Sequence, residues 1–240
     1  MDLRDKVAIV TGASSGIGEA IVRELSSAGV RVLLTARREQ RLAALCAELP
    51  APNGYLAADI DAVDTPQRLL DLAMDTFGRV DILINNAGML VSGSLESVDL
   101  DDLQKMTRVN FDAVVRASYI FARSFKQQGS GAIINISSIG AYLSHSSLGV
   151  YGGLKQALEV FTTALRVELK GSGVRVSSIA PGTTSTEIFD YLRTHNQPVR
   201  ADMTTALEPA DVAATVRYVL EQPARANIAR MLVVSSSEPA

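Results

Sequence analysis

The stretch Thr11-Gly12-Ala13-Ser14-Ser15-Gly16-Ile17-Gly18 decides how this chain folds. It follows the apolar run at residues 7–10 and leads into a helical pattern over residues 16–28, so it predicts a turn from a strand into a helix. Glycines let such a turn approach a dinucleotide pyrophosphate, whose negative charge is favoured at a helix N-terminus. A glycine triplet alone is a weak signal, and an ordinary strand-to-helix turn is the alternative interpretation.

Seven short apolar runs alternate with longer helical patterns along the chain. The runs lie at residues 7–10, 30–34, 55–57, 82–84, 132–136, 174–179 and 231–234, and the helical patterns include residues 16–28 and 99–128. Runs that are apolar throughout are typical of strands covered on both faces, and their alternation with helices predicts a parallel sheet with right-handed crossovers. We therefore expect an α/β protein with one Rossmann-like, doubly wound domain over residues 1–240. Residues 183–207, after the sixth run, are expected to form a mobile substrate lid, because ligands of such sheets bind at the carboxyl ends of the strands.

The composition excludes several classes of protein. Apolar residues make up 47% and charged residues 20%, as in soluble globular proteins, and the net charge of −3 favours neither nucleic acid nor an anionic membrane as a partner. No apolar stretch approaches the ~20 residues of a membrane helix, and the charged residues 1–6 do not resemble a signal peptide. Cys46 is the only cysteine and is expected to be a packed apolar residue, which favours a reducing compartment. These features predict a cytoplasmic protein, and no His, Cys, Asp or Glu spacing indicates a metal site.

A second segment, Tyr151-Gly152-Gly153-Leu154-Lys155, carries the chemistry. Tyr151 and Lys155 are four residues apart and lie on one face of a helix. Reduction of a carbonyl needs a hydride for carbon and a proton for oxygen, and a cation beside a phenol lowers the phenol's pKa toward the working pH. This spacing often occurs by chance, but together with the glycine turn it predicts a carbonyl–alcohol oxidoreductase in which Tyr151 is the general acid and base.

The end of the second apolar run indicates which dinucleotide is bound. An acidic residue there would bind the ribose 2′-hydroxyl, whereas an arginine accommodates a 2′-phosphate. The sequence reads Thr35-Ala36-Arg37-Arg38. A guanidinium group makes strong bidentate contacts with phosphate, so this segment predicts NADP(H). The alternative is that both arginines are solvated residues at the start of a helix.

Two further motifs complete a family resemblance. Asn85-Asn86-Ala87-Gly88 follows the fourth run, and Ser137-Ser138 ends the fifth, with Ser138 thirteen residues before Tyr151. Over nearly its whole length the chain resembles the short-chain dehydrogenase/reductase family. The resemblance implies the strand order 3-2-1-4-5-6-7. It also implies the catalytic residues Asn110, Ser138, Tyr151 and Lys155, with Ser137 in place of Ser138 if the register is off by one. Asn110, a poor residue for the middle of a helix, is expected to hold a water that relays protons to Lys155 through its side chain or its carbonyl.

The same resemblance implies a set of binding residues. Coenzyme contacts are expected from Gly12, Ser14, Ser15, Gly16, Ile17, Gly18, Arg37, Arg38, Asp59, Ile60, Asn86, Ala87, Gly88, Tyr151, Lys155, Pro181, Gly182, Thr184 and Thr186. Substrate contacts are expected from Ser138, His145 and Tyr151, although a solvated loop position for His145 is equally open. Leu154 stands where the family usually has Ser or Thr, which puts only a local hydrogen bond in doubt.

Two alternatives to this function remain. A non-catalytic, NADP-binding redox sensor would not need Tyr151, Lys155 and Ser138, all of which are present. A 3-ketoacyl-acyl-carrier-protein reductase usually ends in a glycine-rich tail, which this chain lacks after residue 229. The segments after residues 181 and 227 look more like broad-specificity NADP-dependent reductases of small hydroxy acids and aldehydes, including the clavulanate-aldehyde reductase type. The substrate is expected to be a small carbonyl compound or alcohol, and its identity stays open.

The helical patterns at residues 99–128 and 150–170 carry apolar residues on more than one side, among them Tyr119, Phe121 and Phe161. Such a helix needs a second partner besides the sheet, and symmetric self-association is common. In the family the equivalent helices pair across a two-fold axis. A second contact often gives tetramers in the family, and we therefore expect a homodimer or a homotetramer. Charged substitutions at Phe121 and Phe161 should disrupt it.

Overall fold

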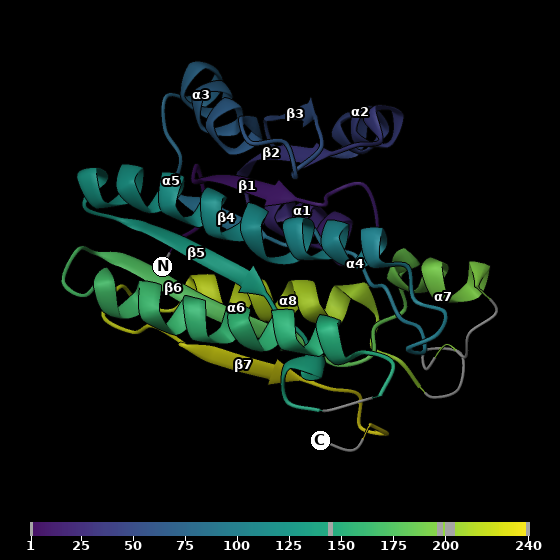
Figure 1. Ribbon diagram of the computed structural model, residues 1–240. Coiled ribbons are helices and arrows are strands. Elements are labelled where there is room, and N and C mark those ends of the chain that lie inside the picture. The colour runs from purple at the N-terminus through teal and green to yellow at the C-terminus, as the bar shows by residue number, and fades with distance from the viewer. Residues whose placement is uncertain (1, 144–145, 196–198, 200–204, 239–240) are drawn as a thin grey trace.

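The computed structural model describes residues 2–143, 146–195, 199 and 205–238. Its centre is a parallel sheet with the order β3-β2-β1-β4-β5-β6-β7, which confirms the predicted topology (Figure 1). The strands are β1 Val7–Thr11, β2 Arg31–Ala36, β3 Asn53–Ala57, β4 Ile82–Asn85, β5 Gly131–Ile136, β6 Val174–Pro181 and β7 Arg230–Val233. The helices are α1 Gly16–Ser27, α2 Glu39–Glu48, α3 Thr65–Phe77, α4 Leu100–Thr107, α5 Ala113–Gln128, α6 Gly149–Glu168, α7 Asp190–Thr194 and α8 Pro209–Glu221.

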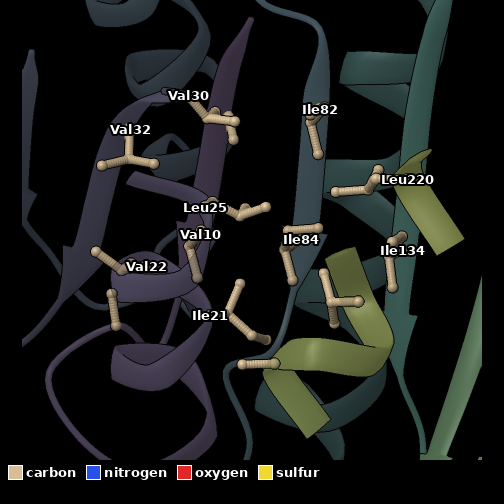
Figure 2. Packing of buried hydrophobic residues seen from close by; sticks show 14 of the residues in the cluster. Val10, Ile21, Val22, Leu25, Val30, Val32, Ile82, Ile84, Ile134 and Leu220 are labelled. Carbon is tan, nitrogen blue, oxygen red and sulfur yellow. The ribbon is translucent and has the colours of Figure 1, made fainter. Parts of the chain in front are cut away.

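Helices cover both faces of the sheet. Helices α1, α2 and α8 pack on one face, where Ile21 and Leu25 of α1 and Leu220 of α8 meet strand residues such as Val10 and Ile84 (Figure 2). Helices α3, α5 and α6 pack on the other face. Successive residues of a strand point to opposite faces, so strands buried between two helical layers must be apolar throughout. Strands β1 and β4 are buried along their whole length and are apolar up to their last residues, Thr11 and Asn85.

The two edge strands differ from the sequence-based expectation of continuous burial. Every residue of β3 is only partly buried, and β7 alternates between exposed and partly buried positions. Each pairs with a neighbour on one side only, β3 with β2 and β7 with β6. The central strands therefore hold the core, and the edge strands close it.

The predicted helix over residues 99–128 is interrupted. Between α4 and α5 the chain forms a π-helical turn, Arg108–Asp112, with buried Asn110 at its centre. A π turn carries one extra residue within a helix and frequently marks a functional site. The amide of Asn110 bonds both backbone groups of Met89, which joins this turn to the segment after β4.

The outer faces of α5 and α6 require a correction to the predicted interface. Phe121 is fully buried against the sheet, so it belongs to the core and a charge there would disrupt the fold rather than an interface. The exposed apolar residues on these helices include Tyr119, Val160 and Val167, with exposed fractions of 39%, 62% and 67%. Phe161 is partly buried and stacks edge-on against Tyr119 at 5.8 Å between ring centroids.

The predicted lid begins in a more regular way than its sequence suggests. A 3-10 turn, Glu187–Phe189, leads directly into α7. Residues 196–198 and 200–204 of the lid lie outside the described residues. Within the described part of the chain, no helix combines the length and the apolar character needed to cross a membrane.

Candidate active site

A cavity of about 1170 Å³ lies beyond the carboxyl ends of the strands. In Figure 1, α4 and α7 lie at the end of the sheet toward which the arrowheads of β5 and β7 point. The cavity is lined by Gly12, Ser14, Ser15, Gly16, Ile17, Gly18, Arg37, Arg38, Asp59, Ile60, Asn86, Ala87, Gly88, Ser138, Tyr151, Lys155, Pro181, Gly182, Thr184 and Thr186. The structure thus brings together every described candidate residue except Asn110.

The turn between β1 and α1 depends on its glycines. Gly12 has a φ of +67°, and a Cβ atom there would lie 2.8 Å from the Cα of Ala87. A Cβ on Gly18 would collide with the carbonyl oxygen of Gly12. The Asn86 amide donates to the carbonyl oxygens of Thr11 and Gly12, at 2.9 and 3.3 Å. The end of β4 therefore holds the turn in place, which is the structural role of Asn86 in this chain.

Arg38 reaches back from the start of α2 to this turn. Its guanidinium donates to the hydroxyls of Ser14 and Ser15 and to a carboxylate oxygen of Glu187, at 2.6–3.1 Å. Arg41 donates to the other oxygen of Glu187 at 2.7 Å. Hydrogen bonds from Arg41 and then Arg38 lower the pKa of Glu187 to about 2.

Arg37 behaves differently from its neighbour. It lines the same cavity, is exposed, and makes no hydrogen bond or ion pair with the residues that the structure describes. The sequence analysis missed Arg41 and Glu187. Arg41 could have been found from its position one helical turn after Arg37. The sequence gives no signal for Glu187, because it is 149 residues from Arg38.

Tyr151 and Lys155 lie side by side on α6 at the closed end of the cavity. Only 9% of Tyr151 and 6% of Lys155 are exposed. The Lys155 Nζ donates to the carbonyl oxygen of Ile136 at 2.9 Å and lies 5.8 Å from the centroid of the Tyr151 ring. Ser138, at the end of β5, hydrogen-bonds to the Tyr151 phenol, and its Oγ accepts from the Gly140 amide at 3.0 Å.

Burial controls the ionisation of both groups. It raises the pKa of Tyr151, which the hydrogen bond with Ser138 partly offsets, and it lowers the pKa of Lys155 to about 8. The sequence analysis expects the cation of Lys155 to lower the pKa of Tyr151. In the chain alone the loss of hydration outweighs any such effect, because a buried phenolate is poorly solvated.

Three other candidates have distinct positions. Both polar atoms of the Asn110 amide bond the backbone of Met89, at 2.9 and 2.8 Å, so the side chain ties this turn to the segment after β4. The Ser137 Oγ is buried without a hydrogen-bond partner among the described residues, whereas Ser138 contacts Tyr151. His145 lies outside the described residues.

Comparison with known proteins agrees with this geometry. A model of the short chain dehydrogenase family matches residues 6–197. The chain belongs to the short-chain dehydrogenase family of oxidoreductases. An uncharacterized oxidoreductase of Staphylococcus epidermidis is 34% identical over 229 residues, which cover 94% of this chain and 95% of that protein.

Solved structures of other oxidoreductases have the same fold. A serine dehydrogenase in its closed form, complexed with NADP+, superposes with a TM-score of 0.85 at 28% identity, covering 95% of this chain and 94% of its own. A metagenomic short-chain oxidoreductase in complex with NADP gives a TM-score of 0.83 at 31% identity, covering 99% and 100%.

This short-chain dehydrogenase departs from the family pattern at Leu154. The side chain is partly buried and packs with the apolar cluster that contains Leu90, Tyr151 and Leu192. Leucine is also a good helix former. Leu154 therefore adds an apolar contact beside Tyr151 where the family usually has a polar side chain, and it leaves α6 intact.

Proposed function

We propose that this protein is an NADP(H)-dependent oxidoreductase that transfers a hydride between the nicotinamide and a small carbonyl compound or secondary alcohol. The observation that carries the proposal is the burial of Tyr151 and Lys155, one helical turn apart, in the same cavity as the glycine turn and Arg37 and Arg38. A coenzyme site and a proton donor thus share one continuous space.

The residues present fit NADP(H). The positive φ of Gly12 and the close approach at Gly18 leave room for a pyrophosphate beside the N-terminus of α1, where backbone N–H groups favour an anion. Arg37 and Arg38, with the hydroxyls of Ser14 and Ser15, would bind a 2′-phosphate. Pro181, Gly182, Thr184 and Thr186 would hold the nicotinamide end. The two NADP-bound structural relatives described above support this choice.

The chain's own residues supply the proton. Bound NADPH supplies the hydride that the carbonyl carbon accepts. Tyr151 donates its phenolic proton to the substrate oxygen, Ser138 donates a second hydrogen bond to that oxygen, and the Lys155 ammonium stabilises the phenolate that forms. The reverse reaction uses the same groups with Tyr151 as the base. Asn110 fixes the segment after β4 through Met89. Lys155 then passes a proton to the Tyr151 phenolate, and the Asn110 carbonyl would hold the water that replaces this proton on Lys155.

The region around Tyr151 favours a substrate with an apolar part. Tyr151 packs in one apolar cluster with Leu90 and Leu192, and Leu148 and Phe189 lie against the same cluster. These side chains also line the cavity. An uncharged ketone, an aldehyde or a hydroxy compound with a short apolar substituent fits these surroundings better than a polyanion does.

A substrate panel tests the proposal. Purified protein is assayed with ketones, aldehydes and hydroxy acids while NADPH or NADH absorbance is followed. We expect turnover of at least one small carbonyl compound with NADPH and slower turnover with NADH. A redox sensor would be favoured instead if the protein binds NADPH tightly but turns over no member of the panel, and if substitution of Tyr151 leaves the NADPH affinity unchanged.

We also propose that the enzyme is a homodimer or homotetramer that uses the outer faces of α5 and α6. Tyr119, Val160 and Val167 are exposed apolar residues on these faces. Val160→Glu should reduce the mass measured by sedimentation while the circular dichroism spectrum stays unchanged. A wild-type species at the subunit mass of 25.6 kDa would contradict the proposal.

A further inference from the structure

A buried carboxylate lies directly beneath the Tyr151–Lys155 pair and outside the cavity. Glu159 follows Lys155 by one turn of α6, and only 1% of its surface is exposed. One of its oxygens accepts from the Ser178 hydroxyl of β6 at 2.5 Å, and the other accepts from Arg230 Nε at 2.9 Å. Acidic residues are rarely buried this completely unless they are paired, so the position needs an explanation.

An ion pair with Arg230 does not explain the burial of Glu159 by itself. The Arg230 side chain is 50% exposed and stacks over the Tyr142 ring, so water screens its charge. Replacing a buried ion pair with apolar residues is often neutral or stabilising, so a link between α6 and β7 would not require a carboxylate. An explanation for the buried charge of Glu159 must therefore include its interaction with a second charged neighbour.

That neighbour is Lys155. Residues four apart on a helix lie about 5–6 Å apart at Cβ, and charges interact strongly where water is excluded. Burial lowers the pKa of Lys155 to about 8, and Glu159 acts in the opposite direction. Among the residues that the structure describes, the titratable and charged groups around the Glu159 carboxylate are Lys155 on α6, Arg230 on β7 and Tyr142 after β5.

We propose that Glu159 is a positioning residue that keeps the Lys155 side chain in its ammonium form at neutral pH. This inference rests on the proposed function, in which the Lys155 ammonium stabilises the Tyr151 phenolate. A neutral lysine would still contact the Ile136 carbonyl, but it would give the phenolate no positive charge. Glu159 thereby acts on proton transfer through Lys155 without touching substrate or coenzyme.

The experiment measures the ionisation of Lys155 directly. The chain has only five lysines, so lysine labelled with ¹³C at Cε gives few NMR signals, and the signal of Lys155 is the one missing from Lys155→Met. Coenzyme-free wild type and Glu159→Gln are titrated. We expect the Lys155 midpoint to fall by about one unit or more in Glu159→Gln, as is typical when an opposite charge nearby is lost. An unchanged midpoint would overturn the proposal.

Two further variants separate charge from packing. Arg230→Gln breaks the same ion pair but removes a cation, so the Lys155 midpoint must stay or rise. A fall like that of Glu159→Gln would show that loss of the structural link is the cause. Glu159→Asp keeps the charge and should restore most of the wild-type midpoint, whereas a midpoint equal to that of Glu159→Gln would contradict a charge effect.

If Glu159→Gln does not fold, the double variant Glu159→Met/Arg230→Met is titrated in its place. It replaces the ion pair with apolar side chains, which proteins often tolerate. The same fall in the midpoint is expected, since the charge of Arg230 is screened. The titration needs no substrate, so a lack of turnover in the panel would refute the proposed function and leave this measurement intact. An unchanged midpoint in an active enzyme would refute only the role of Glu159.

Discussion

The two ends of the cavity handle charge in opposite ways. At the nucleotide end, Arg38 and Glu187 pair with 42% and 43% of their side chains exposed. At the other end, Lys155 and Tyr151 are almost completely buried. Water screens an exposed ion pair, so its partners exchange readily for a ligand, whereas a buried charge interacts strongly with its neighbours. The open end is suited to recognise a charged coenzyme, and the closed end is suited to set pKa values.

The largest effect is expected at the closed end, from Tyr151→Phe. The ring keeps its packing but loses the proton, so turnover should fall about a hundred- to ten-thousandfold, the usual contribution of general acid–base catalysis. NADPH affinity, measured by the fluorescence of the bound coenzyme, should not change. Tyr218→Phe, on the exposed face of α8, is the matched control and should behave as wild type. Near-normal turnover of Tyr151→Phe would refute the proton-transfer role.

The next effect is on stability and concerns Lys155→Met. The pKa of Lys155 is about 8 in the folded protein and 10.5 when the side chain is not buried, as in the unfolded chain. Below pH 8 the buried ammonium therefore destabilises the fold. The unfolded chain binds more protons between these values, and wild-type stability should therefore rise with pH across this window. The shift corresponds to roughly 3 kcal/mol.

Urea unfolding of both proteins from pH 7 to 10.5 measures this difference. Lys155→Met lacks the titrating lysine. Its free energy of unfolding should therefore exceed that of wild type by the largest amount below pH 8, and this difference should shrink as the pH rises. Other ionisable groups cancel in the comparison. A difference in stability that does not change with pH would show that burial does not lower the pKa of Lys155.

Much of this site was predictable from the sequence because its parts are local. The glycine turn, the Tyr151–Lys155 pair and the strand order follow from patterns within a strand, a turn or a helix, or from the family resemblance. The π turn at Asn110 was not predicted, although an asparagine in the middle of a helix was the signal. The prediction that Phe121 lies in an interface between subunits was wrong, because apolar residues around a helix do not show by themselves which of them faces the sheet.

The remaining residues were out of reach for a different reason. Glu159 meets Ser178 and Arg230, which are 19 and 71 residues away in the sequence, and Arg38 meets Glu187 across 149 residues. Such contacts arise only when the crossovers of the sheet bring distant strand ends together. The sequence analysis did not single out Glu159, because the sequence shows neither which side of α6 is buried nor which residues meet there.

The double variant Arg37→Ala/Arg38→Ala is expected to lower NADPH affinity, by a smaller factor than that by which Tyr151→Phe lowers turnover. Loss of hydrogen bonds to a charged group typically costs about 1.5–3 kcal/mol, so NADPH affinity should fall roughly ten- to hundredfold. NADH has no 2′-phosphate, and its affinity should change little. The single variants divide the effect between Arg37, which is unpaired within the described residues, and Arg38, which already binds Glu187. Equal losses for both coenzymes would show that neither arginine binds the 2′-phosphate.

The smallest effect tests the open end itself, through Glu187→Gln. In the coenzyme-free chain the Glu187 carboxylate occupies Arg38, the same group that the 2′-phosphate would use, and it adds a negative charge beside that phosphate. Removal of the charge should therefore strengthen NADPH binding by about two- to fivefold, the scale of an exposed ion pair, and leave NADH binding unchanged. Glu39→Gln, at the start of α2, is the control for a general change in surface charge. Weaker NADPH binding in Glu187→Gln would mean that Glu187 holds Arg38 in its binding position. In that case the open end would be ordered before the coenzyme arrives, and the contrast between the two ends would be one of solvent exposure alone.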